Sequence, residues 1–334
     1  MQFYRAEPTV TSSWRLAVLM GVNTRTYKFA LGEALLAAAR QGRTELPLAD
    51  LAAAYSMSLL RHADHAPQAS LNTAIGERDY LQVAKEEASA SLAAGEPTER
   101  LLNAAMGSMP AMVMQKFHNL RGGTAVPDRF YEVTGSPRER MVVLTPALRK
   151  VVESSQVRSL SVELAARWAI VESSFDTGIG RSLVNEGVTV DLDTWSVLDK
   201  HRRRRVTGVA DAVIGFQHGR CLICNADLLP TEAVAVDHVF PWSMMRMGGV
   251  GTWLGPDLDA VWNLAPAHAR CNGGKSNRPP TREELQRLAL RNAAIMASPY
   301  PLRTTLALTL AAYRAGSGRE EDWVCFLDAV GASV

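Results

Sequence analysis

The sequence predicts a mainly α-helical chain that encloses one small module of mixed α and β structure, which makes the fold class α+β overall. Two observations favour this class. Apolar residues, mostly Ala and Leu, recur at helical spacing over residues 12–155 and again after Thr281. Over residues 219–280 that spacing is lost, and Cys, His, Asn, Gly and Pro are concentrated instead. This composition is typical of a small module that is folded around metal ligands.

Secondary structure outside the module follows from apolar spacing and from capping residues. Thr98 and Thr281 are each followed closely by acidic side chains, which predicts a helix start at both positions. The run 141–145 predicts a short strand. Further helices are expected at 28–40, 48–55, 162–172, 207–217 and 302–314. The methionines near Pro110 are expected to fill irregular core space, and they are Met106, Met109, Met112 and Met114.

The composition of the whole chain narrows the class of protein. A length of 334 residues favours two domains, and a hydrophobic fraction of 47% without an apolar run near ~20 residues indicates a soluble globular protein with no membrane role. Residues 1–8 lack the apolar core of a secretory signal, so a cytoplasmic location is expected. The net charge of +2 neither requires nor excludes a nucleic-acid partner.

The same patterns divide the chain into regions with different expected roles. Residues 1–200 are expected to form an α-helical region that recognises or regulates, although no motif in it says what it would recognise. Residues 201–280 are expected to form the metal-built module. Residues 281–334 are expected to form C-terminal helices that pack on the rest.

Two pairs of metal-ligating residues frame the module. Cys221 and Cys224 form a C-x2-C pair, and His268 and Cys271 form an H-x2-C pair. Zinc in structural sites prefers four Cys or His ligands in a tetrahedron, so the two pairs predict a structural Zn²⁺. The alternative is that the cysteines are incidental and that His268 lies at the surface. The remaining cysteine, Cys325, is expected to be buried in a C-terminal helix.

Acidic, imidazole and amide side chains lie between and beside these pairs. A β-branched run ends in Asp237 and His238, whose side chains should point to opposite faces of a strand and so do different work. Downstream stand Asn263-Leu and then Asn272-Gly-Gly-Lys-Ser, which is expected to open or line a helix. This order resembles the HNH (ββα-metal) endonuclease superfamily, in the type that is framed by zinc knuckles. The resemblance covers only residues 219–278.

The resemblance implies a role for each of these residues. His238 would be the general base that activates a water molecule for attack on phosphorus. Asp237 and Asn272 would bind one catalytic Mg²⁺ or Mn²⁺, and Asn263 would position the loop and orient His238 by hydrogen bonding. His268 stands where many members have Cys. In an alternative assignment it would bind the catalytic metal, which would leave zinc with only three protein ligands.

Basic side chains in and near the module are candidates for phosphate contacts. They are Lys275, Arg246, Arg270, Arg278, Arg203 and Arg204. Arg203 and Arg204 belong to an arginine run that begins after His201, although such a run is also common on a solvated face. Lys275 is the first candidate, because the motif puts it beside Asn272.

The resemblance therefore predicts a metal-dependent DNA endonuclease that nicks or cuts double-stranded DNA by a one-metal mechanism. Analogy with free-standing members points to phage defence or restriction, with proteins of a defence operon as further partners. One alternative is a non-catalytic zinc-dependent DNA-binding module, and another is a nuclease that cuts RNA. Cleavage that depends on a divalent metal would distinguish the endonuclease from the non-catalytic DNA-binding module. Parallel digestion of DNA and RNA would distinguish it from a nuclease that cuts RNA.

Overall fold

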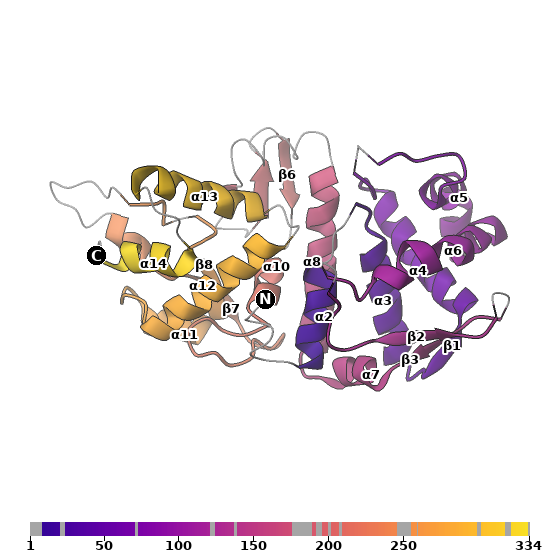
Figure 1. Cartoon of the computed structure of the whole chain (residues 1–334), viewed down its shortest axis with the longest axis horizontal. Coiled ribbons are helices and arrows are strands. Elements are labelled where there is room, and N and C mark those ends of the chain that lie inside the picture. The colour runs from indigo at the N-terminus through magenta and orange to yellow at the C-terminus, as the bar shows by residue number, and fades with distance from the viewer. Residues whose placement is uncertain are drawn as a thin grey trace. The chain divides into compact units, whose positions relative to one another are not determined.

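The computed structural model shows a chain built mostly from helices, with small antiparallel sheets (Figure 1). The predicted mainly helical α+β class is confirmed at this level. Within the described residues, no helix combines the length and the apolar character needed to cross a membrane. The structure describes all residues except 1–8, 21–23, 71–72, 121–123, 137–138, 176–188, 192–195, 200–201, 207–208, 246–254, 259, 299–301, 318–321 and 333–334.

The chain divides into two compact units, one of residues Glu7–Gly180 and one that includes Arg181–Val334. The first unit covers most of residues 1–200, the region predicted to be α-helical. The second holds the residues of the predicted metal module together with the helices that follow it. The C-terminal helices therefore belong to the same compact unit as the module.

Helices dominate the first unit, and one small sheet accompanies them. Strand β3 lies between β1 and β2 and pairs with both in antiparallel fashion. The predicted helix start at Thr98 is confirmed, because its hydroxyl accepts a hydrogen bond from the Leu101 amide at the start of a helix. The strand expected at 141–145 is confirmed as β3. The elements are α2 (Val10–Leu19), α3 (Tyr27–Arg40), β1 (Glu45–Pro47), α4 (Leu48–Ala63), α5 (Tyr80–Ala94), α6 (Glu99–Met112), the 3-10 turn η1 (Met114–Lys116), β2 (Tyr131–Thr134), β3 (Met141–Leu144), α7 (Pro146–Glu153) and α8 (Val157–Phe175).

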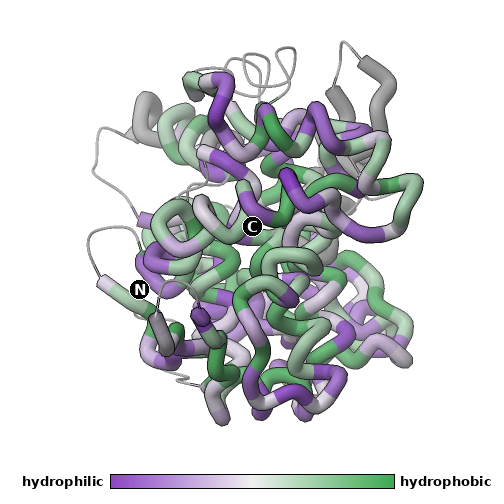
Figure 2. Tube along the Cα trace, turned by 90° about the vertical axis from the view of Figure 1, so that its right-hand side faces the viewer, coloured by the Kyte–Doolittle hydropathy of each residue, from purple (hydrophilic) through white to green (hydrophobic). Residues whose placement is uncertain are grey.

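Aromatic side chains form the core of the first unit. Trp14 from α2 packs edge-on against Phe130, with ring centroids 5.1 Å apart. Phe29 from α3 stacks on Trp168 from α8, with centroids 6.1 Å apart. All four side chains are fully buried, so this unit is held by ordinary apolar packing. Figure 2 shows hydrophobic and hydrophilic residues interleaved along the helices, as expected for helices that bury one face.

One buried ion pair crosses this core. The Arg15 guanidinium on α2 lies 2.7 Å from Glu163 on α8, and the two side chains are only 2% and 5% exposed. A second nitrogen of Arg15 donates to the amide oxygen of Gln156 at 2.8 Å. Each charge is thus matched by a partner, and neither could remain buried alone without a large free-energy cost.

The second unit contains two sheets and a set of helices. Helix α10 confirms the helix expected at 207–217, and α13 confirms the one at 302–314. Strands β4 and β5 correct the prediction that the chain is helical up to residue 200. Their β-branched residues pair across the sheet, Val190 with Val197, which favours strand over helix. The elements are β4 (Thr189–Asp191), β5 (Ser196–Asp199), β6 (Arg202–Val206), α10 (Val209–Phe216), β7 (Val234–His238), the 3-10 turn η2 (Trp242–Met245), β8 (Leu264–His268), α11 (Ala269–Lys275), α12 (Arg282–Ala297), α13 (Leu302–Ser317) and α14 (Trp323–Ala332).

Two further predictions concern the C-terminal helices α12 and α14. Helix α12 begins with a complete capping box, because Thr281 accepts from the Glu284 amide and the Glu284 carboxylate accepts from the Thr281 amide. The predicted helix start at Thr281 is therefore confirmed. Cys325 does lie in α14, but it is exposed, so the prediction that it is buried is wrong. The buried face of α14 carries Trp323, Phe326, Leu327 and Val330, and helical spacing turns Cys325 away from it.

Replacing Arg15 with Met should lower the free energy of unfolding by about 3–5 kcal/mol, because Glu163 would be left buried without its partner. Replacing both residues, Arg15→Met with Glu163→Leu, should recover most of that loss. Arg43→Met is the matched control, since the Arg43–Asp50 pair is 43% and 45% exposed, and it should change stability by less than about 1 kcal/mol. Urea unfolding followed by circular dichroism measures all three, and equal effects for Arg15→Met and Arg43→Met would contradict the assignment.

Candidate functional site

The predicted zinc ligands come together in the second unit. The ligand atoms of Cys221, Cys224, His268 and Cys271 all lie within 4.8 Å of one another. The Nδ1 atom of His268 is 3.4 Å from the Cys224 sulfur and 3.7 Å from the Cys271 sulfur. His268 is only 2% exposed, so the alternative that it is a surface residue is wrong. The cluster could bind a metal such as zinc, since it offers four Cys and His ligands at one point.

Local backbone geometry explains how the first cysteine pair is formed. A tight turn follows Cys221, in which its carbonyl accepts from the Asn225 amide at 2.9 Å and its amide donates to Ala226 at 2.8 Å. Asn225 has a φ of +61°, a left-handed conformation that Asn tolerates better than most residues. The second pair is supplied by the end of β8 and the first turn of α11, so strand pairing and a turn together build the cluster.

The surroundings of His268 fix which of its nitrogens can bind a metal. Its Nε2 atom lies 3.1 Å from the Asp227 carbonyl oxygen and 3.1 Å from the Glu232 carboxylate. Both neighbours only accept hydrogen bonds, so Nε2 carries a hydrogen, and Nδ1, which faces the sulfurs, is the nitrogen that can bind a metal. Metal-binding histidines are commonly held in this way by a carboxylate or a carbonyl. Sequence reasoning missed Glu232, because nothing in its local pattern marks it as a partner of His268.

The thiols of the cluster differ in acidity. Burial raises the pKa of Cys221 to about 11. Burial also acts on Cys224, but hydrogen bonds from the Ala226 amide and from the neighbouring cysteine and histidine side chains outweigh it and lower the pKa of Cys224 to about 7. Metal ligation by cysteine requires the thiolate, so binding at this cluster would release protons.

Asp237 and His238 lie at the far end of the same hairpin. Strands β7 and β8 pair antiparallel, with Val234 opposite His268 at one end and His238 opposite Leu264 at the other. Four residue steps along a strand span about 13 Å. The Cys and His cluster and the Asp237–His238 pair are therefore separate sites. The alternative in which His268 shares a metal with Asp237 does not fit, because its Nδ1 faces the sulfurs at the opposite end.

Asp237 has one occupied and one unoccupied carboxylate oxygen. The Lys275 ammonium lies 3.0 Å from Asp237 Oδ1 and donates a second hydrogen bond to the His238 carbonyl at 2.9 Å. Asp237 Oδ2 is buried and has no hydrogen-bond partner among the residues that the structure describes. Burial raises the pKa of Asp237, and the nearby Lys275 charge opposes that rise. An orphaned buried carboxylate oxygen is costly unless a further donor or a cation satisfies it.

Asn263 is fully buried and braces the loop that follows His238. Its Oδ1 accepts from the Phe240 amide at 2.8 Å, and its Nδ2 donates to the carbonyls of Phe240 at 2.9 Å and Leu258 at 2.7 Å. The role of Asn263 in positioning the loop for catalysis stays a prediction. Both of its amide hydrogens are donated to backbone carbonyls, so none is left to donate to His238 directly.

Helix α11 carries Asn272 and Lys275, which were predicted to act with Asp237 and His238. Asn272 and Lys275 are three positions apart on the helix and therefore share one face, and α11 packs against both β7 and β8. Asn272 is half-buried, whereas the Lys275 side chain has no exposed surface. A phosphate contact by Lys275 stays a prediction, and the structure gives this lysine an internal role between Asp237 and His238.

Helix α12 supplies arginines that sequence reasoning missed. The fully buried Arg291 donates to the backbone carbonyls of Leu264 and Trp262, on either side of Asn263. Arg287 donates to the carbonyls of Leu222, at 2.6 Å, and Ile223, at 2.8 Å, between the two cysteines of the first pair. Both sites are thus braced from one helix. In the sequence these arginines look like a solvated face, because only the tertiary fold brings the carbonyls to them.

The other basic candidates lie in different settings. Arg270 is 76% exposed and lies 3.5 Å from Glu232, next to the Cys and His cluster. Arg278 is engaged by Glu284 at 2.5 Å. Arg203 and Arg204 lie in strand β6, and no description of their side chains is given by the structure. Arg246 lies outside the described residues.

A comparison of the chain with protein-family models found no match, and comparisons with curated proteins and with solved structures found none either. Function therefore rests on the residues and their geometry.

Zinc should be integral to the fold of the second unit. Cys221→Ser should remove zinc and lose much of a metal contribution on the order of 10 kcal/mol. Cys325→Ser is the matched control, because Cys325 is exposed and outside the cluster, and it should keep zinc content and melting temperature. Elemental analysis and thermal unfolding with and without a chelator measure the effect. Protein purified without zinc, or a Cys271→Ser variant with unchanged melting, would contradict this assignment.

Glu232→Gln should weaken zinc binding without abolishing it. The carboxylate holds the His268 ring in the orientation that presents Nδ1, and loss of such a partner costs about 10–100-fold in metal affinity. Competition with a zinc chelator measures the change. An affinity equal to that of the parent protein would show that the Asp227 carbonyl alone orients the ring.

Proposed function

We propose that this chain is a metal-dependent endonuclease of the HNH type, which hydrolyses phosphodiester bonds in DNA. The observation that carries the proposal is the order β7, β8, α11, in which Asp237 and His238 end the first strand and Asn272 lies on the helix that packs on both strands. A separate Cys and His cluster braces the other end of the same hairpin. This arrangement supports a structural metal site at one end of the hairpin and a catalytic site at the other.

The residues at the Asp237 end fit a small divalent cation. Mg²⁺ and Mn²⁺ prefer oxygen ligands, and Asp237 and Asn272 offer a carboxylate and an amide oxygen. The buried Oδ2 of Asp237 has no hydrogen-bond partner among the described residues, so it is available to bind a cation. When bound, the cation would neutralise charge that develops on the phosphate in the transition state.

Side chains of the protein would accept the proton from the attacking water and would hold the reacting groups in position. His238 would accept a proton from the attacking water, because an unprotonated imidazole nitrogen can act as a general base. Lys275 holds the Asp237 carboxylate and the His238 carbonyl together, and Asn263 and Arg291 hold the loop and strand around them. Such bracing would keep the base and the ligands within reach of one phosphate.

DNA is the proposed substrate, with double-stranded DNA preferred. Arg203, Arg204, Arg246, Arg270 and Arg278 supply the positive charge that phosphate binding needs. We place the enzyme in phage defence or restriction, in the cytoplasm, with proteins of a defence operon as partners. The first unit would recognise the target or the activating signal.

The Lys275–Asp237 ion pair favours a second candidate. A buried aspartate that already pairs with a lysine could be structural, and the second unit would then be a zinc-dependent DNA-binding module without catalysis. A plasmid nicking assay with Mg²⁺, with Mn²⁺ and with a chelator separates the two, because only the nuclease cuts when the divalent cation is present. Parallel digestion of labelled DNA and RNA then separates a DNA nuclease from one that cuts RNA.

His238→Ala should keep the fold, the zinc content and near-normal DNA affinity, but lose about 10²–10⁴-fold in cleavage rate, the usual range for a general base. Asp237→Ala and Asn272→Ala should also be inactive and should in addition weaken binding of Mn²⁺, because each removes an oxygen ligand. His65→Ala is the matched control, since that side chain is 79% exposed in the first unit, and it should cut at the parental rate. Parental cleavage by a folded, zinc-loaded His238→Ala variant would make the binding module the better account.

Changing Arg203 and Arg204 together to Ala should weaken DNA binding regardless of sequence. Phosphate contacts release counterions, so the slope of log affinity against log salt should flatten by about 2 if both contact phosphate. Cleavage at saturating protein should survive. Fluorescence anisotropy over a range of salt concentrations measures the slope, and an unchanged slope would place these arginines away from the DNA.

A further inference from the structure

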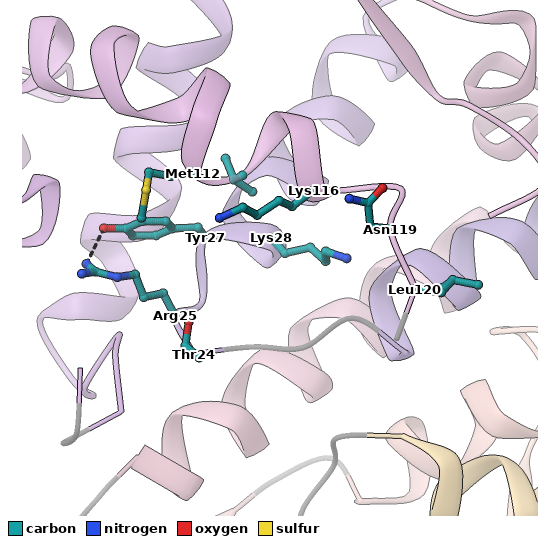
Figure 3. Close-up of a pocket in the computed structure, with 9 residues that line it drawn as sticks. Thr24, Arg25, Tyr27, Lys28, Met112, Lys116, Asn119 and Leu120 are labelled. Atoms are coloured by element: carbon teal, nitrogen blue, oxygen red, sulfur yellow. Dashed lines mark hydrogen bonds between the residues drawn. The ribbon is translucent and has the colours of Figure 1, made fainter. Parts of the chain in front are cut away.

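A pocket of about 410 Å³ lies in the first unit, and none of the residues assigned to the nuclease lines it. Its volume falls in the range typical of small-molecule sites. The start of α3 and the segment from the end of α6 through η1 form its walls, and Figure 3 shows the side chains of Lys28, Lys116 and Asn119 together in it. The lining residues are Thr24, Arg25, Tyr27, Lys28, Met112, Val113, Lys116, Asn119 and Leu120.

Lys28 is an unusual residue for the lining of this pocket. It is only 7% exposed, and its ammonium donates to the Ala17 carbonyl at 3.1 Å and lies 5.7 Å from the centre of the Phe117 ring. No carboxylate lies within ion-pair distance of it among the described residues. Burial lowers the pKa of Lys28 to about 8. Lysine is rarely buried without an acidic partner, because desolvation of its charge is costly.

The charge of the pocket is not balanced from within. Arg25 is neutralised by Asp79, with nitrogen and oxygen 2.6 Å apart. Lys28 and Lys116 have no such partner among the described residues, and none of the residues that line the pocket is acidic. The two lysines therefore give the lining of the pocket a net positive charge.

The start of helix α3 adds to the positive potential. Lys28 is its second residue, and its first turn contains no acidic side chain. The N-cap residue, Thr26, makes no side-chain capping bond, because its hydroxyl donates to Gln68 instead. A helix N-terminus favours a negative charge and disfavours a lysine, so an anion in the pocket would relieve both the helix end and Lys28.

We propose that this pocket binds a small organic phosphate, which is attracted by the charges of Lys28 and Lys116 in its lining. A phosphate monoester carries close to two negative charges at neutral pH and so matches the two ammonium groups. Met112, Val113 and Leu120 give the walls an apolar character that suits the organic part of such a ligand.

The methionines near Pro110 were expected to fill the core. Met109 and Met114 are buried, but Met112 is 42% exposed, and it lines the pocket.

The burial of Lys28 favours a small ligand over a nucleic acid. A phosphodiester inside duplex DNA carries one charge and is flanked by sugars on both sides. It could not approach an ammonium that is only 7% exposed. A terminal phosphate on a small molecule can enter the pocket, with the rest of the molecule directed toward the rim.

Calorimetric titration of the full chain at constant ionic strength tests the proposal, with inorganic phosphate, adenosine monophosphate and the neutral nucleoside adenosine as probes. The two phosphates should bind at one equivalent, and adenosine should not saturate the site. Lys28→Met should weaken phosphate binding at least ~10-fold, in line with the loss of a charge-assisted hydrogen bond. Lys150→Gln is the matched control, because it removes a positive charge from an exposed position on α7 of the same unit, and it should bind as the parent does.

Further variants keep the outcome decisive. If Lys28→Met is unstable by circular dichroism, Lys28→Arg should keep the charge and much of the binding, and Lys116→Gln should lose several-fold. Phosphate binding that is absent from the parent protein, or is unchanged by Lys28→Met, would overturn the proposal. Weaker duplex DNA binding by Lys28→Met without any effect on the small phosphates would reassign the pocket to a nucleic-acid surface. His238→Ala should bind the probes normally, so failure here and failure of the nuclease proposal are distinguishable.

Discussion

The antiparallel pairing of β7 with β8 is the constraint on which the second unit depends. This short ladder sets Val234 opposite His268 and Asp237 opposite Ala265, and so fixes two sites at its two ends. A shift of one residue in register would turn every side chain of one strand to the other face of the hairpin. The residues at each end would then no longer meet. The pairing also gives the helix that follows, α11, a surface to pack on, from which Cys271 joins the Cys and His cluster and Lys275 reaches Asp237.

Such a small hairpin cannot maintain its register by apolar burial alone. Among the described residues, the apolar cluster around the cysteines contains Cys221, Leu228 and Ala267, with a few partly buried neighbours. Polar braces supply what packing does not: Arg287 and Arg291 from α12 bind backbone carbonyls on both sides, and Lys275 ties α11 to the end of β7. Arg291 and Lys275 are buried and Arg287 is half-buried, and each has acceptors within hydrogen-bond distance, which makes the geometry specific but intolerant of the loss of one partner.

The first unit is built on the opposite principle. Its core of stacked and edge-on aromatic rings is large enough to hold the helices by burial, so its exceptions to apolar packing stand out. The Arg15–Glu163 pair is self-contained, whereas Lys28 is buried without an acidic partner among the described residues and lines a pocket. A buried charge that the fold does not neutralise is a natural place for a ligand to do so. The proposals for the two units are independent, because they rest on different residues and different chemistry.

Local sequence was enough for features whose cause is local. Apolar spacing and capping residues predicted α6, α10, α12 and α13, and the C-x2-C and H-x2-C spacings predicted which residues would meet in the Cys and His cluster. The tertiary structure alone decided what depends on contacts between distant segments. Glu232 beside His268, Arg291 across the Asn263 loop and Lys275 against Asp237 join residues that are about 27–38 positions apart. A local pattern carries no information about such partners, because an arginine or lysine on a helix looks the same in sequence whether it faces water or a buried carbonyl. The sheet of β4, β5 and β6 and the exposed position of Cys325 followed the same rule, since cross-strand pairing and the choice of buried face are settled only when the elements pack.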